Sequence, residues 1–345
     1  WGTNKIIIDS NGLNYQSEDD TYTVEYDTDG QTVSIVYSGA TVGWIPESDV
    51  DVTDAPVAPP TQKAIFGYGY NGSNVSMSNL VNSSGVVATD VTGVGTVRTN
   101  LAAASYGLDK AIFGYGHTTG PSSLSNLVSS SGVVATDTTG VGTARYDLAA
   151  AGYGTDKAIF GYGYSSSRVS LTNLVSNSGV VASDTTGVGT GRNDLAATGY
   201  GGDKAIFGYG YLSGHKSMTN LVSNSGVVAA DVTGVGTVRD QLAAAGYGTD
   251  KAIFGYGTNG GDLSMTNLVS NSGVVATDTT GVGSARHALA AAGYGGDKAI
   301  FAYGYGGGYV SMSNLVSNSG VVATDVSGVG TARNQLAAAG YSISA

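Results

Sequence analysis

One stretch of this chain recurs six times at a fixed period of 47 residues. The octet Lys-Ala-Ile-Phe-Gly-Tyr-Gly-Tyr begins at Lys63, and near copies begin, without insertion or deletion, at Lys110, Lys157, Lys204, Lys251 and Lys298. The six units cover the chain from Lys63 to about Ser344. A fixed period of this length is typical of propellers and solenoids, so it constrains the fold more than any local signal does.

Each unit reads as four short strands. Short apolar runs alternate with clusters of Gly, Ser, Asn and Asp, a pattern that favours β-structure over helix. The Ala-rich run has helical propensity, but its flanking glycines and its shortness argue against a helix. Four strands in a unit of this length suit the blade of a propeller. In the third unit the predicted strands are 157–163, 171–175, 180–184 and 195–200.

The two ends of the array are complementary in phase. The array begins on a Lys-Ala-Ile-Phe strand and ends at Leu336 to Tyr341, which is the strand that elsewhere precedes it. A ring closed by pairing these ends has no exposed strand edge, whereas an open solenoid would need atypical capping repeats. The Leu-Ala-Ala-Ala-Gly-Tyr run has the smallest side chains in the unit, and small side chains suit the innermost strands, which crowd around the axis of a propeller. We therefore predict an all-β fold: a six-bladed β-propeller of residues 63–345 with four strands per blade.

The order of motifs resembles the kelch-type propeller repeat. An Arg precedes an apolar strand, then come Ala-Ile-Phe-Gly-Tyr-Gly, a variable loop and Val-Val-Ala-Thr-Asp. In that family a similar Arg precedes the innermost strand and a double glycine ends the next one. Here Gly67 to Gly69 and its copies replace the double glycine, and both tryptophans lie outside the array. The resemblance covers the whole array at the level of pattern.

The composition excludes several classes of protein. The 345 residues include no cysteine, so disulfides and thiolate metal sites are excluded. The net charge is −11, and residues 1–62 carry most of it, with one Lys against eleven Asp and Glu. No basic face indicates nucleic acid as a partner, and no run of 18 apolar residues indicates a membrane span. Because the chain begins at Trp1, we expect a processed chain or a fragment.

Residues 1–54 are predicted to form a small acidic β domain, followed by a Pro-rich linker over 55–62. The runs 5–9, 21–27 and 31–37 read as strands, with Asn-Gly and Asp-Gly turns between them. The acids at 18–20, 27, 29 and 49–54 could bind calcium or form a solvated acidic surface, and no EF-hand pattern is present.

This N-terminal segment resembles a module of tailed-phage structural proteins, notably those of marine phages. The resemblance rests on Asp9-Ser-Asn-Gly-Leu-Asn-Tyr15, Tyr22-Thr-Val, Val33-Ser-Ile-Val-Tyr-Ser-Gly-Ala and Gly43-Trp-Ile-Pro46. In those proteins the module sits beside variable glycine-rich domains.

Two charged positions are the same in all six units. A catalytic site needs one constellation, so a group present in every unit indicates scaffold. We expect each Arg to bond strand-end carbonyls or an Asp, and the alternative is an anion-binding ring. The residues are Arg98, Arg145, Arg192, Arg239, Arg286 and Arg333, with Asp90, Asp137, Asp184, Asp231, Asp278 and Asp325.

Variation is concentrated in the loop after Gly-Tyr-Gly and in the pair of residues after each Arg. Both should emerge on one face of an up-and-down blade and form a rim. Variable polar and aromatic residues on a constant scaffold suit a binding surface, and neutral drift in exposed loops is the alternative. The candidate binding residues are Tyr70, Asn71, His117, Tyr146, Tyr164, Arg168, Tyr211, His215, Lys216, Asn259, Asp262, His287, Tyr305 and Tyr309.

Signals for catalysis are weak. Copper-radical oxidases on kelch-like propellers need a cysteine-linked tyrosine, and this chain has no cysteine. No nucleophile elbow, the motif that would indicate a Ser-His-Asp triad, is present. Glycoside hydrolysis needs two carboxyls, and the acids of the array outside the regular positions are Asp147, Asp194, Asp240 and Asp262. We predict no enzyme activity, no cofactor and no metal in the array.

The two resemblances imply a phage virion protein of the tail fibre, spike or decoration type. Its propeller would recognise a host-surface glycan or protein, and its N-terminal domain would contact other virion proteins. One alternative is a secreted or cell-surface bacterial adhesin. Another is a propeller-type glycan hydrolase.

Overall fold

Strands and turns make up the described protein, without helices. The computed structural model describes residues 6–16, 24–26, 34–46 and 61–344. The chain divides into two compact units, residues 1–59 and 60–345. Of the predicted linker, only Thr61 and Gln62 lie within the described residues.

The N-terminal unit contains two antiparallel strand pairs. Strand β1 (Ile6–Ile8) pairs with β2 (Val24–Tyr26), and β3 (Ile35–Tyr37) pairs with β4 (Trp44–Pro46). Tyr15 and Val24 are buried and pack against Ile8, Ile35 and Trp44. Trp44 of the Gly43-Trp-Ile-Pro46 segment is therefore part of this small core. All of the acidic residues considered for calcium lie outside the described residues.

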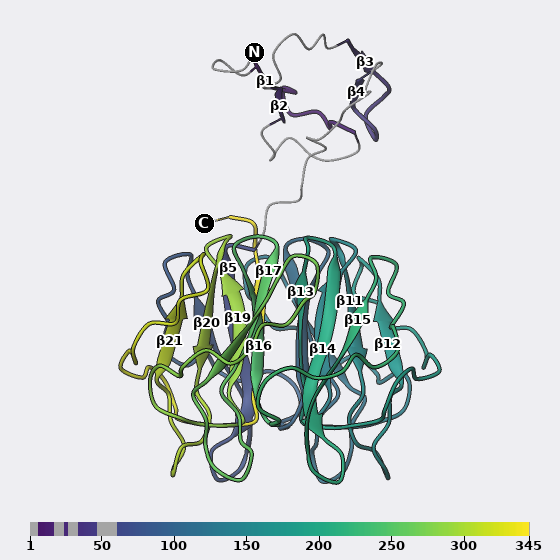
Figure 1. Ribbon diagram of the computed structural model, residues 1–345. Coiled ribbons are helices and arrows are strands. Elements are labelled where there is room, and N and C mark those ends of the chain that lie inside the picture. The colour runs from purple at the N-terminus through teal and green to yellow at the C-terminus, as the bar shows by residue number, and fades with distance from the viewer. Residues whose placement is uncertain (1–5, 17–23, 27–33, 47–60, 345) are drawn as a thin grey trace. The chain divides into compact units, whose positions relative to one another are not determined.

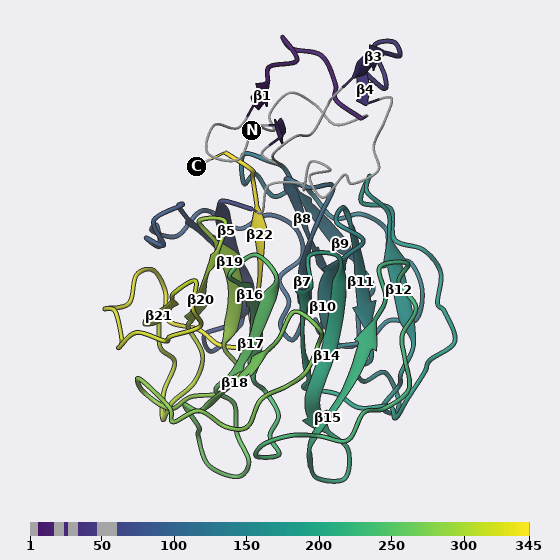
Figure 2. The same ribbon diagram turned by 45° about the horizontal axis from the view of Figure 1, so that its top comes forward.

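The array, residues 61–344, forms six three-stranded antiparallel sheets and is β-propeller-like (Figures 1 and 2). The inner strands are β22 (Ala337–Tyr341), β7 (Ala102–Tyr106), β10 (Ala149–Tyr153), β13 (Ala196–Tyr200), β16 (Ala243–Tyr247) and β19 (Ala290–Tyr294). The middle strands are β5 (Lys63–Tyr70), β8 (Lys110–Gly114), β11 (Lys157–Gly161), β14 (Lys204–Tyr211), β17 (Lys251–Gly255) and β20 (Lys298–Ala302). The third strands are β6 (Asn74–Val81), β9 (Ser125–Val128), β12 (Thr172–Val175), β15 (His215–Val222), β18 (Thr266–Val269) and β21 (Ser313–Val316).

The predicted outermost strand is not a regular strand. In the third unit, the predicted strand 180–184 and the next residue, Thr185, contribute only two isolated bridges to β12, Val175 with Val181 and Thr172 with Thr185. Three steps along β12 therefore face four along the outer segment, which produces a bulge. Beside the bulge, the Asp184 side chain accepts hydrogen bonds from Thr143 and from Asn173 of β12. The prediction of four strands per blade is therefore wrong, because each sheet of the array has three strands and the predicted outermost strand does not form.

The apolar core lies between neighbouring sheets. Between the second and third sheets, Ala104 and Ile112 of one pack with Ala150 and Phe160 of the other. In five of the six repeats the residue after the phenylalanine of the middle strand is a glycine, which leaves room for the next sheet's phenylalanine, and the sixth repeat has Ala302 there. A Cβ on Gly161 would lie 2.7 Å from the ring of Phe207. A side chain at Gly161 would therefore require the Phe207 ring to shift.

The last strand of the array completes the first sheet. Strand β22 pairs with β5, with Ala337 opposite Gly67 and Tyr341 opposite Lys63. This pairing confirms what the phase of the repeat predicted. Backbone hydrogen bonds join the hairpin turns of neighbouring sheets. The Gly154 N–H donates to the Asp203 carbonyl at 2.7 Å, and the Ser342 N–H donates to the Asp109 carbonyl at the same distance. The first and last repeats are thus bonded like any two consecutive repeats.

Candidate functional site

Backbone pairing brings the variable positions together at one end of the sheets. We call this end the rim, and it has four positions in each repeat. The link position, after each Arg, bridges to the loop-start position, which in turn pairs with the loop-end position. In the third sheet these are Tyr146, Tyr164 and Arg168. The convergence expected from blade geometry is therefore present in every repeat.

The fourth rim position is the second residue after each repeated Arg, and we call it the axial position. The six axial residues form a continuous series of backbone hydrogen bonds. Each axial N–H donates to the axial carbonyl of the preceding repeat at 2.8–3.0 Å, and the first donates to the last. All six residues have φ between 49° and 55°. This left-handed conformation is costly for residues other than Gly, Asn and Asp, so the bonded series holds it in place. The residues are Asn100, Asp147, Asp194, Gln241, Ala288 and Gln335.

Partly exposed rings line the rim in two arcs. Arc 1 runs through His117, Tyr146, Tyr164, Arg168, Tyr211 and His215, with ring centroids 5.0–5.6 Å apart and the Arg168 guanidinium 5.0 Å from the Tyr211 ring. Arc 2 runs through His287, Tyr305, Tyr309 and Tyr70, with centroids 5.5–6.0 Å apart. These spacings are those of attractive edge and tilted contacts, so each ring helps to hold its neighbour.

Carboxyl groups lie beside arc 1. The Asn193 amide donates to Asp194 at 2.6 Å and to Asp147 at 3.4 Å, while its oxygen accepts from Arg168 at 2.7 Å. His215 lies 3.0 Å from Asp240. In arc 2, His287 lies 2.6 Å from Asp262. Three of the four acids singled out in the sequence thus lie near arc 1, and the fourth holds a histidine of arc 2.

Burial sets the ionisation of the axial carboxyls. It raises the pKa of Asp147 to about 7, and the charge of Asp240 adds to this effect. It also raises the pKa of Asp194 well above its usual range, with further repulsion from Asp147 and Asp240. The pKa of Asp240 is raised by burial, against the opposing effect of His215. Ionising this group of carboxyls is therefore unfavourable in the folded protein.

These raised pKa values predict that stability falls as pH rises from about 4 to about 7. Across that window the native state holds protons that the unfolded chain has released. Replacing Asp147 and Asp194 with Asn, the residue present at the equivalent position 100, should flatten this dependence. At pH 8 we expect a gain of roughly 1 to 2 kcal/mol, after allowance for solvent screening. Urea unfolding of the parent and of the double variant at pH 5 and pH 8 measures this difference in the free energy of unfolding.

Asp203→Asn is the control for this measurement. The hydrogen bond from Lys204 lowers the pKa of Asp203, so its ionised form stabilises the fold. This variant should gain nothing at pH 8. An equal gain in both variants would indicate a general effect of net charge rather than burial at the axial position.

Beneath the rim, the repeated Arg joins adjacent sheets. Arg192 is fully buried and its guanidinium lies 4.4 Å from the ring of Tyr162 in the third sheet. It donates to the Tyr209 carbonyl at 2.7 Å and to the Asn220 side chain at 2.8 Å, both in the fourth sheet. The network continues to Asp231, which accepts from Asn220.

The repeated Asp is held ionised. Burial acts to raise the pKa of Asp231, but donors from Thr190 and Asn220 and the charge of Arg192 outweigh it, so the pKa lies below its usual value. The Asn of this network was missed in the sequence, although it recurs in every repeat. These residues are Asn79, Asn126, Asn173, Asn220, Asn267 and Asn314, all fully buried.

The remaining candidate residues lie beside the rim. Asn71 and Asn259 lie at loop tips, where each N–H donates two residues ahead, to Ser73 and Gly261. Lys216 follows the loop-end position and pairs with Gly210.

Within the described part of the chain, no group of three His, Asp or Glu is arranged to hold a metal ion. No helix there is long and apolar enough to cross a membrane. Comparison with models of known protein families and with curated protein sequences found no match to this chain.

Proposed function

We propose that the array is a closed six-bladed β-propeller of the kelch type. Three observations support closure. The axial hydrogen bonds run through six repeats and return to the first. The Thr331 N–H donates to Asp90 as Thr190 does to Asp231, 41 residues ahead. Strand β22 contributes the inner strand of the first sheet.

We further propose that the protein is a phage virion protein whose rim recognises a host-surface glycan. The observation that carries this proposal is the pair of aromatic arcs, built at variable positions over a constant scaffold. The resemblance of the N-terminal segment is the reason for placing it on a virion. The array begins at Thr61 and ends at Ser344 at the end opposite the rim (Figure 1), so a tether there leaves the rim accessible.

The chemistry of the arcs suits sugars. Tyrosine faces stack on the CH groups of a pyranose, and Arg168 and Lys216 supply donors for hydroxyl or acid groups. A single site of this kind binds at about millimolar, near −4 kcal/mol. Several copies on one particle would raise the avidity to a useful level.

The carboxyls of arc 1 favour one second candidate, a glycan hydrolase. Asp147 and Asp194 share one amide donor, and a pKa of about 7 at Asp147 is suited to a general acid. Turnover of a polysaccharide panel by the parent but not by Asp147→Asn would support it. The same rim would also serve a bacterial surface adhesin, and mass spectrometry of purified virions distinguishes that source.

The arcs can be tested with residues that the chain already uses at the same positions. Thr258 and Asn74 occupy the loop-start and loop-end positions of other repeats. The double variant Tyr211→Thr, Tyr309→Asn should therefore fold, yet lose one ring from each arc. We expect roughly two- to tenfold weaker glycan binding per ring removed, since each stacked ring contributes about 0.5 to 1.5 kcal/mol. A glycan array and a host-cell adsorption assay measure this loss.

Val274→Thr is the matched control, because Val274 is 65% exposed outside the rim. It should bind like the parent. If the double variant melts and adsorbs like the parent, the ligand binds elsewhere and the rim proposal is wrong.

A further inference from the structure

The first sheet differs from the other five where its inner and middle strands meet. Elsewhere these strands are joined by a turn that ends in Asp-Lys, and the two side chains pair at 2.7–3.2 Å. In the first sheet no turn joins the two strands, because the two ends of the array meet there, and Gln62 precedes Lys63. Within the described part of the chain, Lys63 has no acidic partner, unlike its five counterparts.

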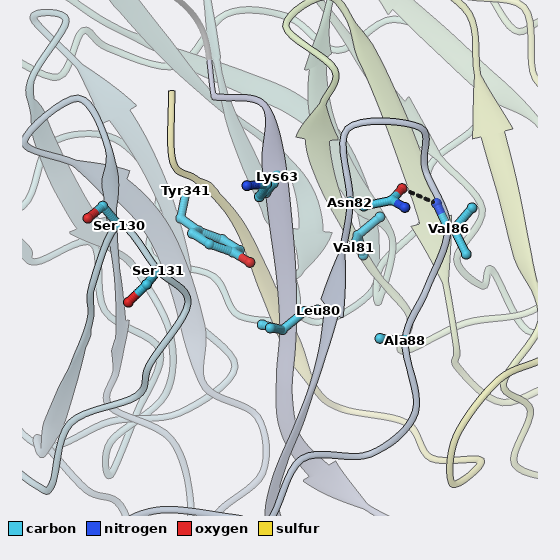
Figure 3. Close-up of a pocket in the computed structure, with 9 residues that line it drawn as sticks. All are labelled: Lys63, Leu80, Val81, Asn82, Val86, Ala88, Ser130, Ser131 and Tyr341. Atoms are coloured by element: carbon cyan, nitrogen blue, oxygen red, sulfur yellow. Dashed lines mark hydrogen bonds between the residues drawn. The ribbon is translucent and has the colours of Figure 1, made fainter. Parts of the chain in front are cut away.

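A cavity of about 370 Å³ opens at this junction, which we call the seam (Figure 3). Figure 3 shows Lys63 and Tyr341 between the Ser130–Ser131 turn on one side and the segment from Asn82 to Ala88 on the other. Leu80, Val81 and Val86 provide apolar lining. The cavity therefore combines one cation and one phenol with an apolar wall.

The sequence explains why the cavity occurs at this junction. Ser130 occupies the position at which four other repeats have Asn. In two of those repeats the Asn side chain donates at 3.0 Å to the Asp that precedes the lysine of its own sheet, as Asn224 does to Asp203, and the counterpart of that Asn in the first sheet is Ser83. The seam has lost both the Asp that neutralises the lysine and, in the neighbouring sheet, the larger Asn side chain.

We propose that the seam binds a small organic monocarboxylate. The carboxylate would lie against the Lys63 ammonium and the Tyr341 hydroxyl, in place of the missing Asp, with a compact apolar body over Leu80, Val81 and Val86. One lysine matches one negative charge, whereas phosphate sites gather several donors, often from Arg or consecutive N–H groups. The volume lies at the small end of the range for ligand pockets, roughly 300 to 1,000 Å³.

Such a ligand would contact the first and last strands of the array together with the neighbouring sheet. Lys63 belongs to β5, Tyr341 to β22, and Ser130 follows β9. The unfolded chain does not assemble these residues, so binding stabilises the folded state by mass action. Occupancy of the seam is therefore measurable as a rise in Tm, independently of any activity at the rim.

Benzoate is the probe, and benzyl alcohol is its neutral counterpart. Two readouts are combined: the Tm of the unmodified protein, and the NMR signals of ¹³C-dimethylated lysines, which keep their charge. The decisive variant is Gln62→Asp with Ser130→Asn, because it restores the residues that other junctions carry. Lys63→Met removes the cation and identifies its signal. Lys157→Met removes a lysine that is paired with Asp156 and serves as the control.

We expect benzoate to shift the Lys63 signal in a saturable way and to raise the Tm, while benzyl alcohol does neither. Affinity should fall at least tenfold in the restored variant and in Lys63→Met, and stay unchanged in Lys157→Met. Equal binding of benzyl alcohol, parent-like binding by the restored variant, tighter binding of inorganic phosphate, or the absence of saturable binding would each overturn the proposal.

Discussion

Deleting residues 334–345 should destabilise the array by at least about 5 kcal/mol, which is comparable to the whole stability of many domains. The deletion removes β22 and its buried side chains, including Leu336, Ala337 and Tyr341. It also bares the edge of β5 in the first sheet, which then lacks its inner strand. We expect an aggregation-prone product that lacks a cooperative unfolding transition in calorimetry.

Deletion of residues 343–345 alone is the control, because these residues follow β22. It should change the stability by less than about 0.5 kcal/mol. A 334–345 deletion that melts at the parent temperature would show that β22 is dispensable, and the closed propeller would have to be abandoned.

Arg192→Ala is expected to cost roughly 3 to 5 kcal/mol, the usual effect of breaking a buried charged network. The substitution leaves the Asn220 oxygen and the Tyr209 carbonyl without their buried donor. It also removes the cation over the Tyr162 ring. Denaturant unfolding should report this loss, while glycan binding per folded molecule stays nearly unchanged.

Arg98→Ala provides an internal comparison. The Arg98 Nε is buried without a partner, whereas the Arg192 Nε donates to a carbonyl. The Arg98 substitution should therefore cost about 1 kcal/mol less, the value of one hydrogen bond. Unchanged stability together with lost binding would instead identify the arginines as an anion-binding ring.

The repeat carried most of the information about the fold. Because the period has no insertions, Leu336 to Tyr341 could be recognised as the strand missing before Lys63, and β22 pairs there. The position of Arg192 between strands likewise indicated carbonyl partners. The same comparison of repeats could have identified Asn220 as its second partner, since the Asn recurs in every repeat.

Other features have no local signal. Val180 to Asp184 has the composition of a strand, yet this segment and Thr185 form only isolated bridges to β12. The axial position holds Ala288 at φ 51°, and alanine gives no indication of a left-handed backbone. The raised pKa of Asp194 depends on carboxyls from neighbouring repeats, which the sequence separates by about one period. The seam cavity lies at the one junction where the Asp that precedes the lysine elsewhere is replaced by Gln62.

Strand β22 also determines when this protein can finish folding during synthesis. The β5–β6 hairpin is complete at Val81, but its inner partner ends at Tyr341. At roughly 5 to 20 residues per second, the ribosome needs about 13 to 52 s to add the intervening residues. Throughout that time Ile65 and Phe66, which are fully buried in the finished protein, lack part of their packing. Nascent chains should therefore depend on chaperones until β22 has been synthesised, and a chain that stops within the last repeat should be degraded rather than persist as a smaller ring.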